Sequence, residues 1–147
     1  MNSQQRIASI VMMLVTLSCW ATETDVEGRW LSGNGEGWIE IKLVGDSLIG
    51  IAAGSATAKK GDPPRLDDKN PDPSLRDKPI DGSTIMSGFT YEGDGRWTGG
   101  TIYDPNSGNT YKSTVTVVDD DTLKVRGYIG ISLFGRSDTW TRDDKHK

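Results

Sequence analysis

The sequence has few of the residues on which most catalytic and metal sites depend. Its 147 residues include one cysteine, Cys19, and one histidine, His146. We expect the segment that holds Cys19 to be removed, and His146 stands next to the last residue. A nucleophile paired with a histidine base, a zinc site with cysteine or histidine ligands and a disulfide framework therefore all lack their components. We expect a protein that is not an enzyme and that has no cofactor and no metal site.

A surplus of positive charge is also missing. Lys and Arg total 17 against 21 Asp and Glu, which gives a net charge of -4, and the basic residues form no block. Because nucleic acids and anionic membranes attract basic surfaces, neither is expected as a partner. Hydrophobic residues make up only 34% of the chain, but 18 Gly and 5 Trp favour short strands and turns over disorder or a helical bundle. The length suits one domain with its own core.

Long hydrophobic runs are absent except near the start of the chain. Residues 1–6 are polar with one positive charge, residues 7–17 are apolar, and Ala21 follows a short segment of mostly small residues. The run is too short to span a bilayer, which needs about 20 apolar residues, so no transmembrane segment is expected. The pattern predicts a signal peptide over residues 1–21, cleaved near Ala21, and a periplasmic or secreted protein.

Two alternatives to the signal peptide remain open. Residues 7–17 could form a buried strand or helix at the start of the domain. Leu17-Ser18-Cys19 partly resembles a bacterial lipobox, which would make Cys19 a lipid anchor. In the preferred interpretation, residues 22–147 form the mature domain.

From Gly28 onward, apolar alternation and turn residues recur about every ten residues, the spacing of a sheet meander. Ile39 and Ile41 fall on one face of a strand, with Glu40 and Lys42 on the other, so each strand is expected to be half-buried. The chain has few helices that could cover an open sheet. Antiparallel strands in sequence order then leave no free edge if they close into a barrel. The sequence therefore predicts a single all-β domain, an eight-stranded antiparallel up-and-down barrel. The predicted strands are residues 27–32, 36–44, 47–57, 83–91, 95–103, 109–118, 122–131 and 135–142.

A long insertion rich in Pro, Asp and Lys, residues 58–82, follows the third predicted strand. It carries five of the six prolines and cannot be a central strand. Its six acidic and six basic residues are expected to pair with one another and order the loop. Loops of this length in a compact domain are usually functional or disordered, and we favour a function.

Asp68, Asn70 and Asp72 stand at alternating positions, as in the first half of a calcium-binding EF-hand loop. Pro73 occupies the position where that loop needs a glycine, and Pro79 the position of its bidentate glutamate. We therefore interpret the three side chains as turn caps in a rigid, proline-kinked flap rather than as calcium ligands.

The ends of the predicted barrel hold a candidate closing arrangement. Gly28-Arg29-Trp30 opens the first strand, Trp140-Thr141-Arg142 ends the last, and these two strands are neighbours in a closed meander. A tryptophan with a guanidinium across its ring would seal one end by packing and cation–π attraction, so Trp30, Trp140 and Arg142 are assigned to closure. In this feature the sequence resembles the lipocalin and calycin superfamily, whose barrels open at one end onto a ligand cavity.

An ordered set of short motifs covers nearly all of residues 22–147. Together they resemble one family, the bacterial domain of unknown function 2147. The resemblance implies an exported bacterial protein with a small lipocalin-like β-barrel, and it implies no activity. The motifs are Gly28-x-Trp30, Lys69-Asn70-Pro71-Asp72-Pro73-x-Leu75-Arg76, Trp97-x-Gly99-Gly100-x-Ile102-Tyr103-Asp104-Pro105, Gly108-x-Thr110-Tyr111, Val125-Arg126-Gly127-Tyr128-Ile129-Gly130 and Gly135-Arg136-x-x-Thr139-Trp140.

The first functional hypothesis is a non-catalytic binding or carrier barrel for a small amphipathic or anionic molecule, with residues 58–82 as a flap. Its candidate contacts could equally belong to an outer polar face. The alternative is an interaction module with a side-chain-filled barrel, which docks an envelope protein through Asn70, Pro71, Asp72 and Pro73. The candidate ligand contacts are Arg76, Tyr103, Arg126, Tyr128 and Arg136.

Overall fold

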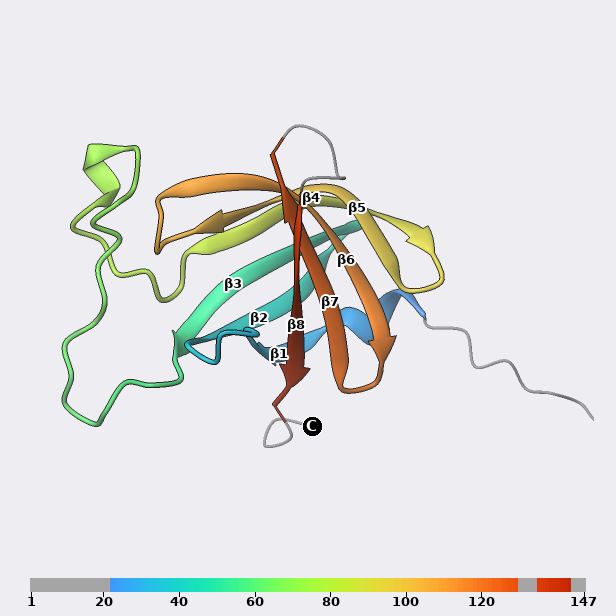
Figure 1. Cartoon of the computed structure of the whole chain (residues 1–147), viewed down its shortest axis with the longest axis horizontal. Helices are drawn as coiled ribbons and strands as arrows, with labels where there is room; N and C mark the ends of the chain where they lie inside the picture. Colours follow the sequence, from blue (N-terminus) through green and yellow to red (C-terminus); the bar gives the residue numbers. More distant parts are fainter. Residues whose placement is uncertain (1–21, 130–134, 144–147) are drawn as a thin grey trace, which may run out of the picture.

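A computed structural model describes residues 22–129 and 135–143, so the predicted signal peptide lies outside the described residues. Eight antiparallel strands close into one barrel in sequence order (Figure 1), which confirms the predicted fold. Within the described part of the chain, no helix is long and apolar enough to cross a membrane. The strands are β1 (Gly28–Leu31), β2 (Gly37–Val44), β3 (Ser47–Ser55), β4 (Thr84–Gly93), β5 (Arg96–Asp104), β6 (Asn109–Asp119), β7 (Thr122–Tyr128) and β8 (Arg136–Arg142), and the short 3-10 helices are η1 (Glu23–Val26) and η2 (Pro73–Leu75).

The up-and-down order gives the barrel two different ends. Tight turns after β2, β4 and β6 lie at one end, together with η1, and we call this the closed end. The connections after β1, β3 and β5 lie at the other end, which we call the loop end. Residues 56–83, the connection after β3, project from the loop end on the left of Figure 1. The insertion therefore stands beside the loop end of the barrel.

The core fills the middle and the closed end of the barrel. Alternate residues of each strand point inward, so Ile39 and Ile41 are buried while Glu40 and Lys42 are not. A bulge lies in β5 between Trp97 and Gly100, where the register with β6 shifts, and Gly99 within it has φ +76°. The ring of Phe89 occupies the place where a side chain on Gly100 would begin, so the glycine pair bends the barrel around this ring.

Arg142 and Trp30 join three segments at the closed end. The guanidinium carbon of Arg142 lies 4.0 Å from the centroid of the fully buried Trp30 ring. The guanidinium nitrogens of Arg142 also donate hydrogen bonds to the backbone carbonyl oxygens of Glu27, at 2.6 Å, of Asp25, at 2.7 Å, and of Asp120. Trp140, with 3% of its surface exposed, packs in the same core. One arginine thus ties the first strand, η1 and the β6–β7 turn together.

The seam between β1 and β8 is the shortest in the barrel. Only two residue pairs join these strands, Trp30 with Arg142 and Leu31 with Thr141. Asp138 extends the seam, because its Oδ2 accepts a hydrogen bond from Gly33 N at 3.0 Å in the β1–β2 connection. The same oxygen accepts one from the Trp140 indole N–H at 2.9 Å.

An Asp138→Ala substitution is therefore expected to lower the free energy of unfolding by about 1–3 kcal/mol, because it leaves both donors without this acceptor. Urea unfolding followed by circular dichroism measures the change. Asp46→Ala, in the exposed turn between β2 and β3, serves as the control and is expected to stay within about 0.5 kcal/mol of the wild type. Equal loss in both variants would show that Asp138 does not hold the seam.

Candidate functional site at the loop end

The inner surface near the loop end is built by four consecutive strands. Ile102 of β5 is paired with Tyr111 of β6, and Ser113 of β6 is paired with Gly127 of β7. Gly127 is in turn paired with Arg136 of β8. Because Val115, Val125 and Trp140 face the core, strand alternation places these five residues on the inner face as well. The inner surface therefore changes from apolar near the core to mixed near the loop end.

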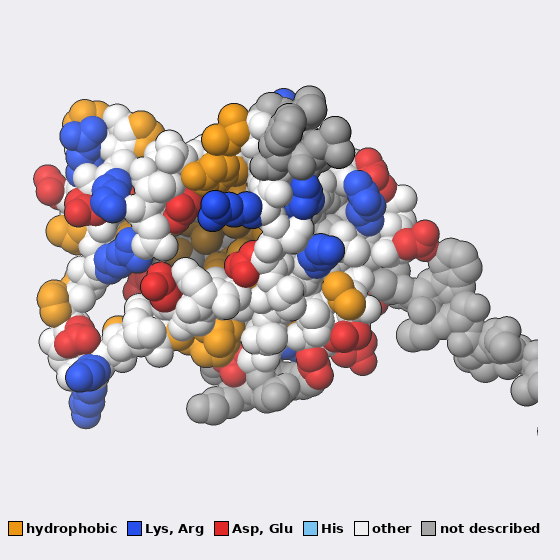
Figure 2. Space-filling model, viewed as in Figure 1, with side chains coloured by type: hydrophobic (Ala, Val, Ile, Leu, Met, Phe, Trp, Pro, Cys, Tyr) orange, Lys and Arg blue, Asp and Glu red, His pale blue; other side chains and the backbone are white. Residues whose placement is uncertain are grey.

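The inner surface has more space at the loop end than in the middle of the barrel. A Cβ atom on Gly50 would come within 2.7 Å of Met86, whereas one on Gly127 would meet nothing closer than the Tyr111 Cβ at 3.6 Å. A Cβ atom on Gly37 would meet only Ser32 Oγ, at 3.9 Å. Figure 2 shows a hollow in the surface to the right of the long loop, with hydrophobic side chains in its floor and charged ones around it. This is the shape and polarity that an amphipathic ligand requires.

Two buried polar atoms face into the barrel without a hydrogen-bond partner among the described residues. They are Oγ of Ser113 and the indole Nε1 of Trp97, and both residues have 0% of their surface exposed. Buried polar groups almost always have a partner, and a missing partner costs about 1–3 kcal/mol. The hydroxyl can donate or accept a hydrogen bond, and the indole N–H can only donate. A polar ligand atom or a water molecule that reached either atom would satisfy it.

Most of the predicted ligand contacts do not share this inner surface. Tyr103, Arg126 and Tyr128 alternate with the inward-facing Ile102, Val125 and Gly127, so they lie on the outer face. Arg126 donates to Ser137 Oγ at 3.1 Å. Of the five candidates, Arg136 alone has an inward register, at the rim of the loop end.

Ser113 and Trp97 were missed by the sequence analysis, although the sequence carries a signal for Ser113. Counting back in steps of two from Val117 and Val115 along the inward row of β6 reaches Ser113 and then Tyr111. A polar residue that interrupts an apolar inward row marks a place where the interior is not purely a packed core.

Tyr103 fixes the long loop to the outside of the barrel. Its hydroxyl donates a 2.6 Å hydrogen bond to Asp67 Oδ1, and the side-chain amide of Asn70 donates a 2.7 Å bond to Oδ2 of the same carboxylate. Asp67 and Asn70 are buried by these contacts. Tyr103 and Asn70 therefore use their polar groups to hold the loop.

The Asn70-Pro71-Asp72-Pro73 segment is a pair of capped turns. Oδ1 of Asn70 accepts a hydrogen bond from Asp72 N at 2.9 Å, and Asp72 caps η2 by accepting from Ser74 N at 2.9 Å. The Ser74 hydroxyl and backbone N–H lower the pKa of the Asp72 carboxyl. Arg76 Nε donates to the carbonyl oxygen of Asn70 at 2.8 Å, so Arg76 also acts inside the loop.

The expected pairing of charges within the loop is wrong, because no ion pair joins two residues of 58–82, all of which the structure describes. The loop is attached instead to the β5–β6 turn, where Arg65 and Lys69 donate to Asn106 Oδ1 and O at 2.6 and 2.7 Å. Gly108, with φ +74°, lets the Lys69 carbonyl approach closely. Exposed ion pairs contribute little to stability in water. The loop is held in one conformation instead by its hydrogen bonds to Asn106 and by the buried carboxylate of Asp67.

The Tyr103 hydroxyl provides a pH test of this attachment. Burial, and then the hydrogen bond to Asp67, raise its pKa from 10.0 to about 12. Because the protonated phenol is the donor, its contribution to stability is complete below pH 10 and is lost as the pH rises towards 12. In an ultraviolet titration of the four tyrosines, we expect one phenol to ionise near pH 12 and Tyr103→Phe to remove that step. If Tyr111→Phe removes it instead, the assignment is wrong.

Comparison with known proteins gives a family and a fold. The model of the family DUF2147, described as an uncharacterised protein conserved in bacteria, matches residues 28–142. Among solved structures, protein HP1028 of Helicobacter pylori, described as belonging to the lipocalin family, matches with a TM-score of 0.71 and 21% sequence identity. The match covers 81% of this chain and 84% of that one. No curated protein matches the sequence.

Proposed function

The chain belongs to the DUF2147 family, and from its lipocalin-like barrel we propose that it is a non-catalytic protein that binds a small amphipathic molecule through the loop end. The apolar part of the ligand packs near Ile102 and Gly127, and a polar group of the ligand reaches Ser113 Oγ. Arg136 at the rim attracts an anionic group on the ligand. The pattern of residues 1–21 supports export, so we place this function in the periplasm or outside the cell.

The observation that carries the proposal is the hydroxyl of Ser113, which has no hydrogen-bond partner among the described residues. An alanine would pack at this inward position without burying a polar atom, so a filled barrel gains nothing from the serine. A barrel that binds a ligand gains a hydrogen bond that orients the ligand. The indole N–H of Trp97, a residue that is paired with Val115 nearer the closed end, also has no hydrogen-bond partner among the described residues.

Ser113→Ala separates binding from folding. The substitution is expected to leave the free energy of unfolding unchanged or slightly higher, because it removes a buried polar atom that has no partner. It is expected to weaken binding of an amphipathic anion, 1-anilinonaphthalene-8-sulfonate, about tenfold, since the ligand loses one hydrogen bond in a dry site. Fluorescence titration measures the affinity, and urea unfolding measures the stability.

Ser87→Ala is the matched control, because Ser87 is exposed on β4. It should change neither affinity nor stability. Equal affinity in Ser113→Ala and Ser87→Ala would contradict the assignment of Ser113 to the ligand. A wild-type protein that binds no amphipathic probe would favour the filled barrel and an envelope partner of residues 58–82.

A further inference from the structure

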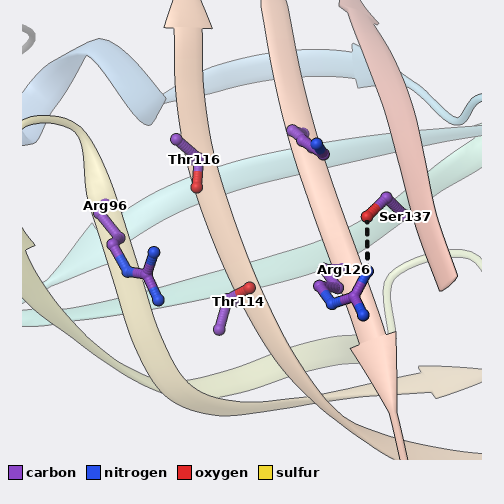
Figure 3. Close-up of a pocket in the computed structure, with 6 residues that line it drawn as sticks. Arg96, Thr114, Thr116, Arg126 and Ser137 are labelled. Atoms are coloured by element: carbon purple, nitrogen blue, oxygen red, sulfur yellow. Dashed lines mark hydrogen bonds between the residues drawn. The ribbon is translucent and has the colours of Figure 1, made fainter. Parts of the chain in front are cut away.

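A second concave site lies on the outside of the barrel, on the opposite side of the sheet from the proposed ligand site. It is a groove of about 300 Å³ across β5, β6, β7 and β8 (Figure 3). This volume is at the small end of the range for small-molecule sites. We call it the basic groove, and its lining residues are Arg96, Thr114, Thr116, Lys124, Arg126 and Ser137.

Strand register explains how these six side chains come together. Thr116 of β6 is paired with Arg96 on one side and Lys124 on the other. One step along the same face, Arg126 of β7 is paired with Thr114 and Ser137. Two neighbouring rows therefore each combine cationic and hydroxyl groups. Figure 3 shows Arg96 and Arg126 on either side of the strand that carries the two threonines.

The charge of the basic groove is unusual for this protein. Among the residues that the structure describes, three cationic ones and no carboxylate line it, although the chain has a net charge of -4. Like charges on neighbouring positions of a sheet face repel one another, so the clustering of these three cationic side chains does not stabilise the fold. Glu92 lies beside the groove, with its Oε2 3.4 Å from Arg96 Nε and both side chains more than half exposed. Such a pair is weak and leaves the centre of the groove positive.

The chemistry of the lining residues matches one class of ligand. Guanidinium groups donate paired hydrogen bonds to tetrahedral oxyanions, and hydroxyl groups donate to the remaining oxygens. We propose that the basic groove binds a phosphate group carried by a small soluble molecule. The small volume of the groove and the net charge of -4 of the chain disfavour the other source of phosphate, an anionic membrane surface.

The test uses the full mature chain and inorganic phosphate as the probe. Backbone amide resonances are followed by nuclear magnetic resonance during a phosphate titration at constant ionic strength, with chloride as the reference anion. We expect saturable shifts at the six lining residues with phosphate and none with chloride. Lys124→Gln is expected to weaken binding about tenfold, because one charge-assisted contact is lost.

Lys42→Gln is the matched control, since it removes the same charge from the outer face of β2, on the opposite side of the closed barrel. It should leave phosphate affinity unchanged. Absence of saturable shifts, or equal weakening by Lys42→Gln, would overturn the proposal. Sedimentation with phosphatidylglycerol vesicles but no shifts with phosphate would overturn the small-molecule source. Ser113→Ala, which tests the ligand site inside the barrel, should leave the phosphate shifts unchanged, so the two proposed sites can be tested separately.

Discussion

Trp30→Ala is expected to lower the free energy of unfolding by about 3–5 kcal/mol, the usual cost of removing a large buried aromatic side chain. Trp30 is fully buried, its indole N–H donates to Val26 O at 3.0 Å, and Arg142 covers its ring. The substitution therefore leaves a cavity and also removes the surface on which the guanidinium rests. The free energy of unfolding of a domain is commonly only about 5–15 kcal/mol, so this single substitution removes a large part of it.

Trp38→Ala is the matched control for this result. Trp38 is only half-buried on the outer face of β2, where the Arg29 guanidinium lies 5.0 Å from its ring centroid. Its loss should cost clearly less than the loss of Trp30, about 1–2 kcal/mol, because part of the Trp38 ring stays in contact with water. Chemical unfolding of both variants measures the difference. Similar costs for the two tryptophans would contradict the closing role of Trp30.

Gly127→Phe is expected to abolish binding at the loop end while the barrel remains folded. Gly127 faces inward beside Ser113, and the space next to it would accept a Cβ atom without a close contact. A phenyl ring at this position would occupy the space proposed for the ligand. Affinity for 1-anilinonaphthalene-8-sulfonate should fall at least about a hundredfold, with a stability cost of about 1–3 kcal/mol from overpacking.

Ser87→Phe adds the same ring to the exposed outer face of β4 and should leave binding unchanged. Circular dichroism checks that both variants keep the strand content of the wild type. If Gly127→Phe folds and still binds the probe with wild-type affinity, the ligand does not enter through the loop end.

The strands could be predicted from the sequence because each has one buried face. The predicted strand 36–44 differs from β2 by one residue, and its inward Ile39 and Ile41 alternate with outward polar residues as expected. The predicted strand 122–131 ends at Tyr128 in β7, and residues 130 and 131 lie outside the described residues. Because period-two alternation and turn residues are local signals, they are visible without the tertiary structure.

The candidate site could not be predicted to the same extent, because it depends on which strands meet and on what covers them. Arg126 and Tyr128 were chosen for their chemistry, but alternation from the buried Val125 already places them outside. Tyr103 also lies outside, and only the folded loop shows that its partner is Asp67. That Ser113 Oγ has no partner in the described part of the chain follows from how the strands close, which no local pattern reveals.

Native mass spectrometry of the mature protein, purified from a bacterial envelope and compared with its denatured mass, tests the central claim most directly. The account predicts a reproducible excess mass that denaturation releases and that Gly127→Phe no longer carries. It also predicts that the Lys42→Gln control keeps the excess mass. A wild-type protein whose native and denatured masses agree, and which binds no amphipathic probe in titration, would contradict a ligand-binding barrel.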